Sequence, residues 1–448
     1  MTRTGAASNA IAKERVNTIQ EAFPESGLFA NKKWRISPEP LALPKKVIKE
    51  LNSLGHLLAN FLKASNTIYN QSVKNKAPSW VCSYLDAGKP DHLIEKGRHK
   101  KFSNSLPRII RPDLIWTEDG FAITELDSIP GGIGLTAWLN KTYSDLGYEV
   151  LGNSKGMLNG FASILPKGAD ILVSQESSEY KPEMEWLSKE LNDHFSSINF
   201  NVFDAEKYQI TDRAVYRFFE LFDLDNIAQT NDLFEAAANS QIDITPSFKP
   251  QMEEKMWSAL LHSRPLLSYW TAQLRQKHLE RLSNYFPYSW IIDPSPIPHH
   301  AELPGLGINA WHQLGEFSQK ERNLVMKISG FSELAWGSRS VRIGSDMSAS
   351  EWQQAIELAT NDFPERPWIM QRFKKSRVIE HSYWNEEIKK IESIDVRARI
   401  CPYYFLSEEN SSNCKAELGG VMATLVPADK KIIHGMSEAI IVPCIQEP

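Results

Sequence analysis

Four charged residues around one turn carry the clearest chemical signal in this sequence: Arg111, Asp113, Glu125 and Asp127. Carboxylates that crowd together repel one another unless a cation compensates their charge. Sites built from carboxylate oxygens suit Mg²⁺ or Mn²⁺. The three acidic residues therefore predict a metal site with Arg111 beside it. The alternative is a solvated hairpin face of mixed charge, which is the ordinary composition of a protein surface.

A β-hairpin would bring these four side chains together. Two runs of alternating apolar residues flank a short loop that ends at Gly120, and glycine readily takes the positive φ that such a turn requires. If Thr117 and Phe121 close the turn, Arg111 faces Asp127 and the other two acids face each other. Side chains alternate along a strand, so all four would project from one face, with opposed Cβ atoms about 4.5–5.5 Å apart.

A lysine and a loop of small residues form a second candidate site. The run NLVMKI from Asn323 predicts a strand that carries Lys327, and the run SGFSELAWGSRSVRIG after it predicts a loop that leads to another strand. Such a lysine and loop can supply a positive charge and backbone N–H groups to phosphate oxygens. The loop is neither a Walker P-loop nor a G-x-G-x-x-G turn. A surface β-hairpin with a long loop would show the same pattern.

Two later strands carry further candidate ligands. The strand WIMQRF, from Trp368 to Phe373, is apolar at its start and polar at its end, as expected of an interdomain hinge where an adenine could stack. The strand DVRARICPYYF carries Arg397 and Arg399 on one face, because side chains repeat with period two. Guanidinium pairs bind phosphates and carboxylates, although exposed sheet faces also carry arginine for solubility.

Composition excludes several classes of protein. A chain of 448 residues exceeds what one hydrophobic core usually serves, so we expect two or three subdomains. Fractions of 42% apolar and 23% charged residues indicate a folded protein. Lys and Arg total 50 against 55 Asp and Glu, which gives no basic footprint for nucleic acid. The cysteines lack the spacing of a disulfide framework or zinc site, and we expect buried, inert thiols: Cys82, Cys401, Cys414 and Cys444.

The location of the protein can also be predicted. No apolar run approaches the ~18 residues of a membrane span, and the first residues lack the apolar segment of a signal peptide. We expect a cytoplasmic protein without a membrane partner.

Periodicity predicts the elements that position the candidate residues. The first hundred residues are mainly helical. A strand from Ala169, a helix from Lys181 and a strand from Ile198 predict a small parallel α/β unit. A long helical region, residues 251–286, is expected to break at its internal proline, and the proline-rich residues 287–307 mark a boundary.

Taken in order, these motifs resemble the circularly permuted ATP-grasp families. From about Arg108 onward the chain has an Arg-x-Asp strand, a hairpin, a Glu-x-Asp strand, an α/β and helical region, a strand lysine, a small-residue loop and a strand containing glutamine. The plan is most similar to the synthetase domain of glutathionylspermidine synthase and related uncharacterised bacterial proteins. The resemblance implies an α/β (α+β) fold, a circularly permuted ATP-grasp with an N-terminal helical region and a small parallel α/β, pre-ATP-grasp-like subdomain.

The resemblance also implies roles for the candidate residues. Asp113, Glu125 and Asp127 would hold one or two Mg²⁺ ions, or Mn²⁺, although such enzymes usually have Asn where Asp127 stands. Arg111 would lie against the transferring phosphoryl group or the substrate, and Lys327 would contact the α- and β-phosphates of ATP. A loop, an adenine hinge and a later strand would supply the other contacts: Gly337, Ser338, Arg339, Gln371, Arg372, Phe373, Arg397 and Arg399.

The implied organisation has four parts. Residues 1–105 form a mainly helical N-terminal region, residues 106–150 the metal-binding hairpin and the following helix, residues 151–310 an α/β and helical subdomain, and residues 311–448 the nucleotide-binding lobes.

The implied activity is an ATP-dependent carboxylate–amine ligase. A small-molecule carboxylate would form an acyl phosphate with Mg-ATP, and a small-molecule amine would capture it as an amide or peptide bond. This chemistry requires no protein nucleophile, so we assign none to His434 or Cys414. A metal-dependent hydrolase is one alternative, but it would leave Lys327 without a function. A nucleotide-binding protein without turnover is the other, and the oligomeric state is open.

Overall fold

A computed structural model describes residues 3–25, 27–28, 33–335, 337–407, 415–433, 435 and 438–447. The chain divides into two compact units, each assembled from separate stretches of sequence. Unit 1 contains Met1–Asn60, Leu106–Ser247 and Lys375–Pro448, and unit 2 contains Phe61–Ser105 and Phe248–Lys374. The predicted boundaries after residues 105, 150 and 310 stay predictions.

A seven-stranded sheet is the centre of unit 1. Its strand order is β1-β15-β14-β13-β2-β3, and β12 pairs with β13. Only β1 and β15 pair in parallel; the other pairs are antiparallel. The strands are β1 (Leu41–Leu43), β2 (Ile109–Thr117), β3 (Gly120–Asp127), β12 (Val378–Asn385), β13 (Lys390–Phe405), β14 (Glu417–Pro427) and β15 (Ile440–Gln446).

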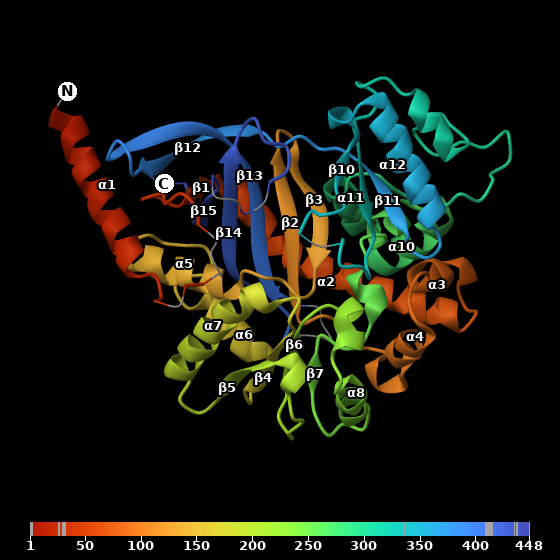
Figure 1. The fold of residues 1–448 in the computed structure, drawn as a ribbon, viewed down its shortest axis with the longest axis horizontal. Coiled ribbons are helices and arrows are strands. Elements are labelled where there is room, and N and C mark those ends of the chain that lie inside the picture. Colours follow the sequence, from red (N-terminus) through yellow and green to blue (C-terminus); the bar gives the residue numbers. More distant parts are fainter. Residues whose placement is uncertain are drawn as a thin grey trace. The chain divides into compact units, whose positions relative to one another are not determined.

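The long strand β13 connects distant parts of the sequence within this sheet. Its first half pairs with β12 and its second half with β2, while β14 lies along its other edge. In Figure 1 the orange β2 lies beside the blue β13. The second half of β13 ends in three aromatic residues, which suit a buried strand. Two helices pack against β14, namely α5 (Ile133–Asp145) and α6 (Gly156–Ile164).

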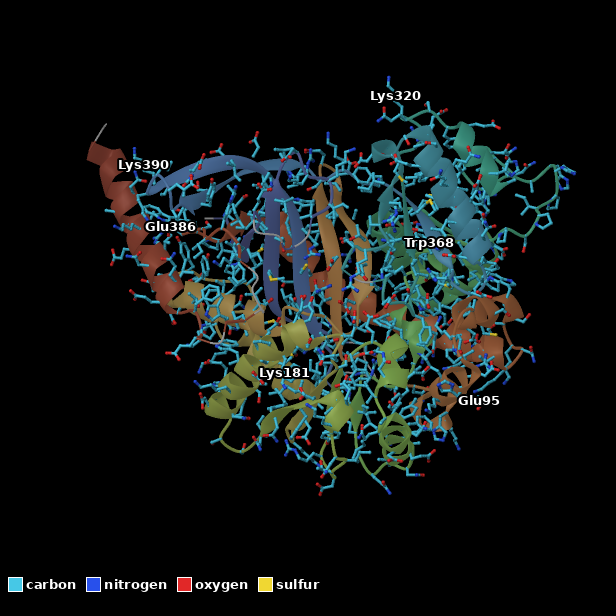
Figure 2. The ribbon with its side chains drawn as sticks, viewed as in Figure 1. Glu95, Lys181, Lys320, Trp368, Glu386 and Lys390 are labelled. Carbon is cyan, nitrogen blue, oxygen red and sulfur yellow. The ribbon has the colours of Figure 1, made fainter. Side chains whose placement is uncertain are left out.

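Unit 1 also contains the predicted parallel α/β unit. Four parallel strands have the order β5-β4-β6-β7. The helix α7 (Lys181–His194), whose first residue is labelled in Figure 2, connects β4 to β5. The sequence prediction for this region is therefore confirmed. The strands are β4 (Ala169–Val173), β5 (Phe200–Asp204), β6 (Val215–Phe218) and β7 (Ile244–Thr245).

Unit 2 is built around an antiparallel four-stranded sheet with the order β10-β9-β11-β8. Met326, Ile328, Trp352 and Met370 belong to its buried core. A capping box, in which Ser348 and Glu351 bond each other's backbone N–H groups, begins α12 (Ala349–Asp362). The strands are β8 (Ser289–Ile291), β9 (Leu324–Ile328), β10 (Arg342–Ile343) and β11 (Trp368–Arg372).

The predicted helical region of residues 251–286 begins later than expected and is broken twice. Residues Pro250–Glu253 form a 3₁₀ turn, and the first α-helix of the region, α9, begins at Trp257. Pro265 lies in a short 3₁₀ turn after α9, as expected of proline. A second break, which the sequence analysis missed, occurs at Arg275, where φ is 62°. Among the described residues, no helix is long and apolar enough to span a membrane. The remaining helices are α1 (Arg3–Glu21), α2 (Lys45–Val73), α3 (Ser79–Asp86), α4 (Asp91–Arg98), α8 (Thr230–Ala238), α9 (Trp257–His262), α10 (Leu267–Leu274) and α11 (Gln276–Tyr285).

Candidate functional site

The hairpin of β2 and β3 arranges the four predicted charged residues in two facing pairs. Arg111 lies opposite Asp127, and Asp113 lies opposite Glu125, so both predicted pairs are confirmed. These pairs sit at the end of the hairpin that is remote from its turn, where β3 leads into the segment before α5.

The turn reaches this register by a route that the sequence did not predict. Thr117 pairs with Gly120, so the prediction that Phe121 closes the turn is wrong. A register shift between Asp113 and Leu114 then restores the expected pairs, because a bulge places one extra residue in one strand. Gly120 has a φ of 130°, which confirms why glycine stands there.

On the charged face of the hairpin, Asp113 is buried, whereas Arg111, Glu125 and Asp127 are half-buried. Asp113 is 5% exposed, and its carboxylate contacts two guanidinium groups. The Nε of Arg111 lies 3.1 Å from Oδ1, and Nη1 of Arg399 donates to Oδ2 at 3.0 Å. Arg111 also donates to Asp127 through Nη2 at 2.9 Å. A buried charge is costly unless it is paired, so the two guanidinium groups allow the carboxylate of Asp113 to leave water.

The donor set has the chemistry of a site for a hard divalent cation. Burial raises the pKa of Asp127; Arg111 opposes this effect, whereas Glu125 and Asp113 add to it. A carboxyl group with a raised pKa gains from added positive charge, whether a proton or a metal ion. In the part of the chain that the structure describes, however, no three acidic, His or Cys side chains are grouped as a metal site. A metal ion here would compete with guanidinium groups for Asp113, and the three ligands stay a prediction.

A buried glutamate that the sequence analysis missed holds the segment after the hairpin. Glu183, on α7, is 0% exposed and lies at the N-terminus of α5. Its carboxylate accepts backbone N–H groups from Gly132 at 3.2 Å and Gly134 at 2.8 Å. Burial raises the pKa of Glu183 to about 8, although these N–H groups and Arg111 favour the ionised form. One signal could have identified Glu183: it shares a helical face with Leu187 and Leu191.

The residues Gly131–Gly134, here called the glycine turn, are also held from another side. The carbonyl oxygen of Gly131 accepts from the hydroxyl of Tyr403 at 2.7 Å and from Nη1 of Arg111 at 3.2 Å. A Cβ atom on Gly131 would lie 2.2 Å from the ring of Tyr180. Side chains are therefore excluded by close packing at the same turn that Arg111 contacts.

Arg397 and Arg399 have different surroundings although both belong to β13. Arg399 bonds Asp113 and so completes a group of five charged residues, here called the hairpin cluster: Arg111, Asp113, Glu125, Asp127 and Arg399. Arg397 donates to the carbonyl oxygen of Ala428 at 2.7 Å and also bonds that of Ser376. Among the contacts of the described residues, Arg399 bonds a hairpin acid and Arg397 does not. A phosphate-binding role for either arginine stays a prediction.

In unit 2, Lys327 lies in a buried chain of polar groups. Its Nζ donates to Oε1 of Gln371 at 3.1 Å, and Nε2 of Gln371 donates to Oγ of Ser289 at 3.0 Å. The three residues are 6%, 3% and 2% exposed, in that order, and they come from the paired strands β9, β11 and β8. Two predicted nucleotide-binding residues are therefore neighbours, and Ser289 is an unpredicted third member.

The predicted phosphate loop begins at a buried ionic group. Ser329 bonds one carboxylate oxygen of Glu254, and the other oxygen bonds Nζ of Lys89. The Lys89 and Glu254 side chains are only 1% and 2% exposed. Farther along, Gly337 and Arg339 are exposed, so the loop is anchored where it leaves β9. Ser338, between them, has a φ of 61°.

The other two predicted hinge residues are separately engaged. The guanidinium of Arg372 lies 5.4 Å from the centroid of the Trp290 ring and bonds the carbonyl oxygen of Gly305. The backbone N–H of Phe373 donates to the carbonyl oxygen of Asn323 at 3.1 Å. Because this N–H is already bonded, an adenine would have to bond other backbone groups. The adenine hinge stays a prediction.

The thiols show no arrangement for nucleophilic catalysis in the described chain. Burial raises the pKa of Cys401 to about 12, and its Sγ lies 3.5 Å from Oδ1 of Asp113. Cys444 is buried and Cys82 is half-buried, and all three are free thiols. Cys414 and His434 lie outside the described residues.

Comparisons with known proteins bear on the fold. No protein-family model and no curated protein matches the chain. A glutathione synthetase-like effector from Globodera pallida, in its apo form, has a similar structure with a TM-score of 0.57, 11% identity, and coverage of 97% of this chain and 96% of that chain. A proposed γ-glutamylcysteine synthetase from Methylobacillus flagellatus matches with a TM-score of 0.40, too low to bear on the fold, at 10% identity over 80% of this chain and 85% of that chain. The chain therefore has a mixed α/β fold, as predicted, and this fold is similar to that of the glutathione synthetase-like effector.

Proposed function

We propose that this chain is an ATP-dependent carboxylate–amine ligase of the circularly permuted ATP-grasp type. The observation that carries the proposal is the buried carboxylate of Asp113, which lies between the half-buried guanidinium groups of Arg111 and Arg399 on the hairpin face. A purely structural face would be more stable with apolar residues, because buried ion pairs rarely repay their desolvation. Retained buried charge therefore favours a functional site.

The chemistry requires positioning and charge neutralisation more than bond making by the protein. The substrate carboxylate attacks the γ-phosphate of ATP, giving an acyl phosphate and ADP. The amine then attacks the acyl carbon and releases inorganic phosphate, which leaves an amide or peptide bond. Bound Mg²⁺ neutralises charge on phosphate oxygens. Asp113, Glu125 and Asp127 supply oxygen donors of the type that this ion prefers.

The buried polar chain in unit 2 supports nucleotide binding. Gln371 accepts from Lys327 and is itself fixed by Ser289, so the ammonium group is held in one position. A fixed lysine can serve phosphate oxygens as a point charge. A metal-dependent hydrolase would have no use for this arrangement.

A nucleotide-binding protein without turnover is the second candidate. It is favoured by the double engagement of Asp113, since a carboxylate bonded to two guanidinium groups is a poorer metal ligand. The similar effector fold does not decide between the candidates, because likeness of fold does not imply activity.

Two measurements test the proposal. Calorimetry with ATP, with and without Mg²⁺, should show Mg²⁺-dependent binding, and absence of nucleotide binding would overturn both candidates. ADP release is then measured with a pool of small carboxylates and amines. Turnover that depends on both substrate classes supports the ligase, and binding without ADP release supports the second candidate.

Matched variants connect the activity to the site. Asp113→Asn and Lys327→Met should each lower ADP release by about a hundredfold or more, because each removes charge stabilisation. Asp243→Asn is the control, since Asp243 is 45% exposed and pairs with Arg108 outside the hairpin cluster. Equal activity of Asp113→Asn and the control would remove the hairpin from the mechanism.

A further inference from the structure

The glycine turn has two sets of partners that meet on it from different elements. Glu183 of α7 binds its N–H groups at Gly132 and Gly134. Arg111 of β2 and Tyr403 of β13 bind its carbonyl oxygen at Gly131. One short segment therefore connects a buried carboxylate to the arginine of the hairpin cluster.

Arg111 is the residue through which this connection reaches the acids. Its guanidinium group contacts Asp113, Asp127 and the carbonyl oxygen of Gly131. Three acceptors on different segments determine where a planar guanidinium group can lie. A displacement of the glycine turn would remove one of them and would let Arg111 move relative to both acids.

Burying the ionisable side chain of Glu183 costs free energy, which argues that this residue does more than fill space. Its side chain is completely buried, and burial raises its pKa from the ordinary 4.5 to about 8. An N-terminal helix cap needs only a small polar side chain from the preceding residue, as serine or aspartate provides in most helices. Here the cap comes from another helix, and no side chain fits on Gly134, whose Cβ would lie 2.6 Å from the carbonyl oxygen of Glu183.

We propose that Glu183 is a positioning residue of the hairpin cluster: through the glycine turn it holds Arg111 between Asp113 and Asp127. Its consequence for turnover rests on the proposed function. The mechanical coupling between Glu183 and the other side of the turn is a property of the fold, and it can be measured without any activity. The competing explanation is that Glu183 only caps α5.

A double-mutant cycle tests the coupling. Glu183→Gln keeps the shape and one acceptor oxygen, and Tyr403→Phe removes only the hydroxyl that bonds Gly131. We expect the urea midpoint of the double variant to shift by clearly less than the sum of the two single shifts, because residues that share one segment are not independent. Additive shifts would overturn the proposal.

Asp170→Asn supplies the matched control. Asp170 is another buried carboxylate of unit 1, 1% exposed, and its partners Tyr208 and Arg213 are not partners of Tyr403. Its cycle with Tyr403→Phe should be additive. Equal coupling in both cycles would mean that any buried carboxylate gives the effect, which would also overturn the proposal.

Kinetics supply the readout that a simple cap would not move. In full-length protein, Glu183→Gln should lower kcat for ADP release by about tenfold or more, as changes behind a metal or catalytic site commonly do, while KM for ATP changes less than twofold. Asp170→Asn should leave both unchanged. Loss of stability without loss of kcat overturns the proposal. If the wild type shows no turnover, the ligase proposal fails and the double-mutant cycle alone decides the role of Glu183.

Discussion

At the scale of single residues, the hairpin cluster is a balance between like and unlike charge. Three carboxylates, of Asp113, Glu125 and Asp127, lie near two guanidinium groups, of Arg111 and Arg399. The carboxylates outnumber the guanidinium groups by one, and the pKa of Asp127 is raised first by burial and then by Glu125 and Asp113, against the effect of Arg111. An added cation is the change that would relieve this repulsion.

Removing one arginine should make the cluster a better cation site. Arg399→Met leaves Asp113 with one guanidinium partner, so we expect a loss of stability of about 3 kcal/mol and a larger thermal stabilisation by Mn²⁺ than in wild type. Thermal unfolding with and without Mn²⁺ measures both. Arg213→Met, which breaks the ion pair with Asp170, is the control and should gain nothing from Mn²⁺. If Arg399→Met responds to Mn²⁺ no more than this control, the cluster does not bind the ion.

Glu183 should make stability depend on pH. Its pKa is raised from 4.5 to about 8 by burial, so the folded protein binds this proton more tightly than the unfolded chain. Protonation of Glu183 therefore adds to the free energy of unfolding below about pH 4.5. This contribution is lost as the pH rises towards about 8, by at most about 1.4 kcal/mol for each pH unit. We expect the unfolding free energy of wild type, relative to Glu183→Gln, to fall between pH 5 and pH 8 in urea titrations. A constant difference would show that Glu183 is ionised throughout.

Local residues could be predicted from the sequence better than their partners. Gly120 and the alternating runs sufficed to locate the hairpin, because a hairpin depends on neighbours in sequence; the two facing pairs were correct only because an unpredicted bulge offset the wrong turn closure. Arg399 lies 286 residues from Asp113, and nothing in either local pattern connects them. Glu183 was missed for the same reason: only the fold brings α7 to the glycine turn.

At the scale of elements, buried ionic groups fix where loops begin. The loop after β9 starts at Ser329, which bonds Glu254, which in turn bonds Lys89 between α3 and α4. Neither charged side chain is accessible to water, so each depends on the other.

Lys89→Met should therefore destabilise the protein strongly. It leaves Glu254 buried without its cation, at a cost of about 3–5 kcal/mol. Urea unfolding measures the loss, and a protease that cuts the loop should act faster on the variant. The double variant Lys89→Met/Glu254→Leu should recover much of the stability, because it removes the buried charge altogether. A double variant as unstable as the single one would contradict this explanation.

The capping box of α12 gives a milder expectation. Ser348→Ala removes the side-chain acceptor of the Glu351 N–H and should cost about 1 kcal/mol, measured by urea unfolding. Gln354→Ala, at an exposed position farther along the same helix, is the control. A cost equal to that of the control would mean that the box adds nothing in this helix.

At the scale of the whole molecule, the units are not contiguous pieces of sequence. Periodicity predicted β4, α7, β9 and β11, since these depend on local alternation and length, whereas the mixed α/β class of the whole chain was predicted from the family resemblance. It could not predict that Leu41–Leu43 pairs with the last strand of the same sheet. Such pairing depends on contacts between chain ends, which no local pattern records.

A fragment of residues 106–448 should therefore fail to fold cooperatively. It lacks β1, which pairs with β15, and Leu51, whose carbonyl oxygen accepts the hydroxyl of buried Tyr404. Circular dichroism during urea unfolding should show a broad, shallow transition instead of the sharp one expected of the full chain. A sharp transition in the fragment would show that the first segment is dispensable.

The order of the segments in the sequence also affects how the protein folds while it is being synthesised. The hairpin emerges from the ribosome 286 residues before the strand that brings Arg399 to Asp113. At ordinary rates of translation this interval lasts roughly 15 to 60 s. Throughout that time the edge of β2 that pairs with β13 in the folded protein has no neighbouring strand. Nascent chains with such an unpaired strand edge recruit chaperones or aggregate.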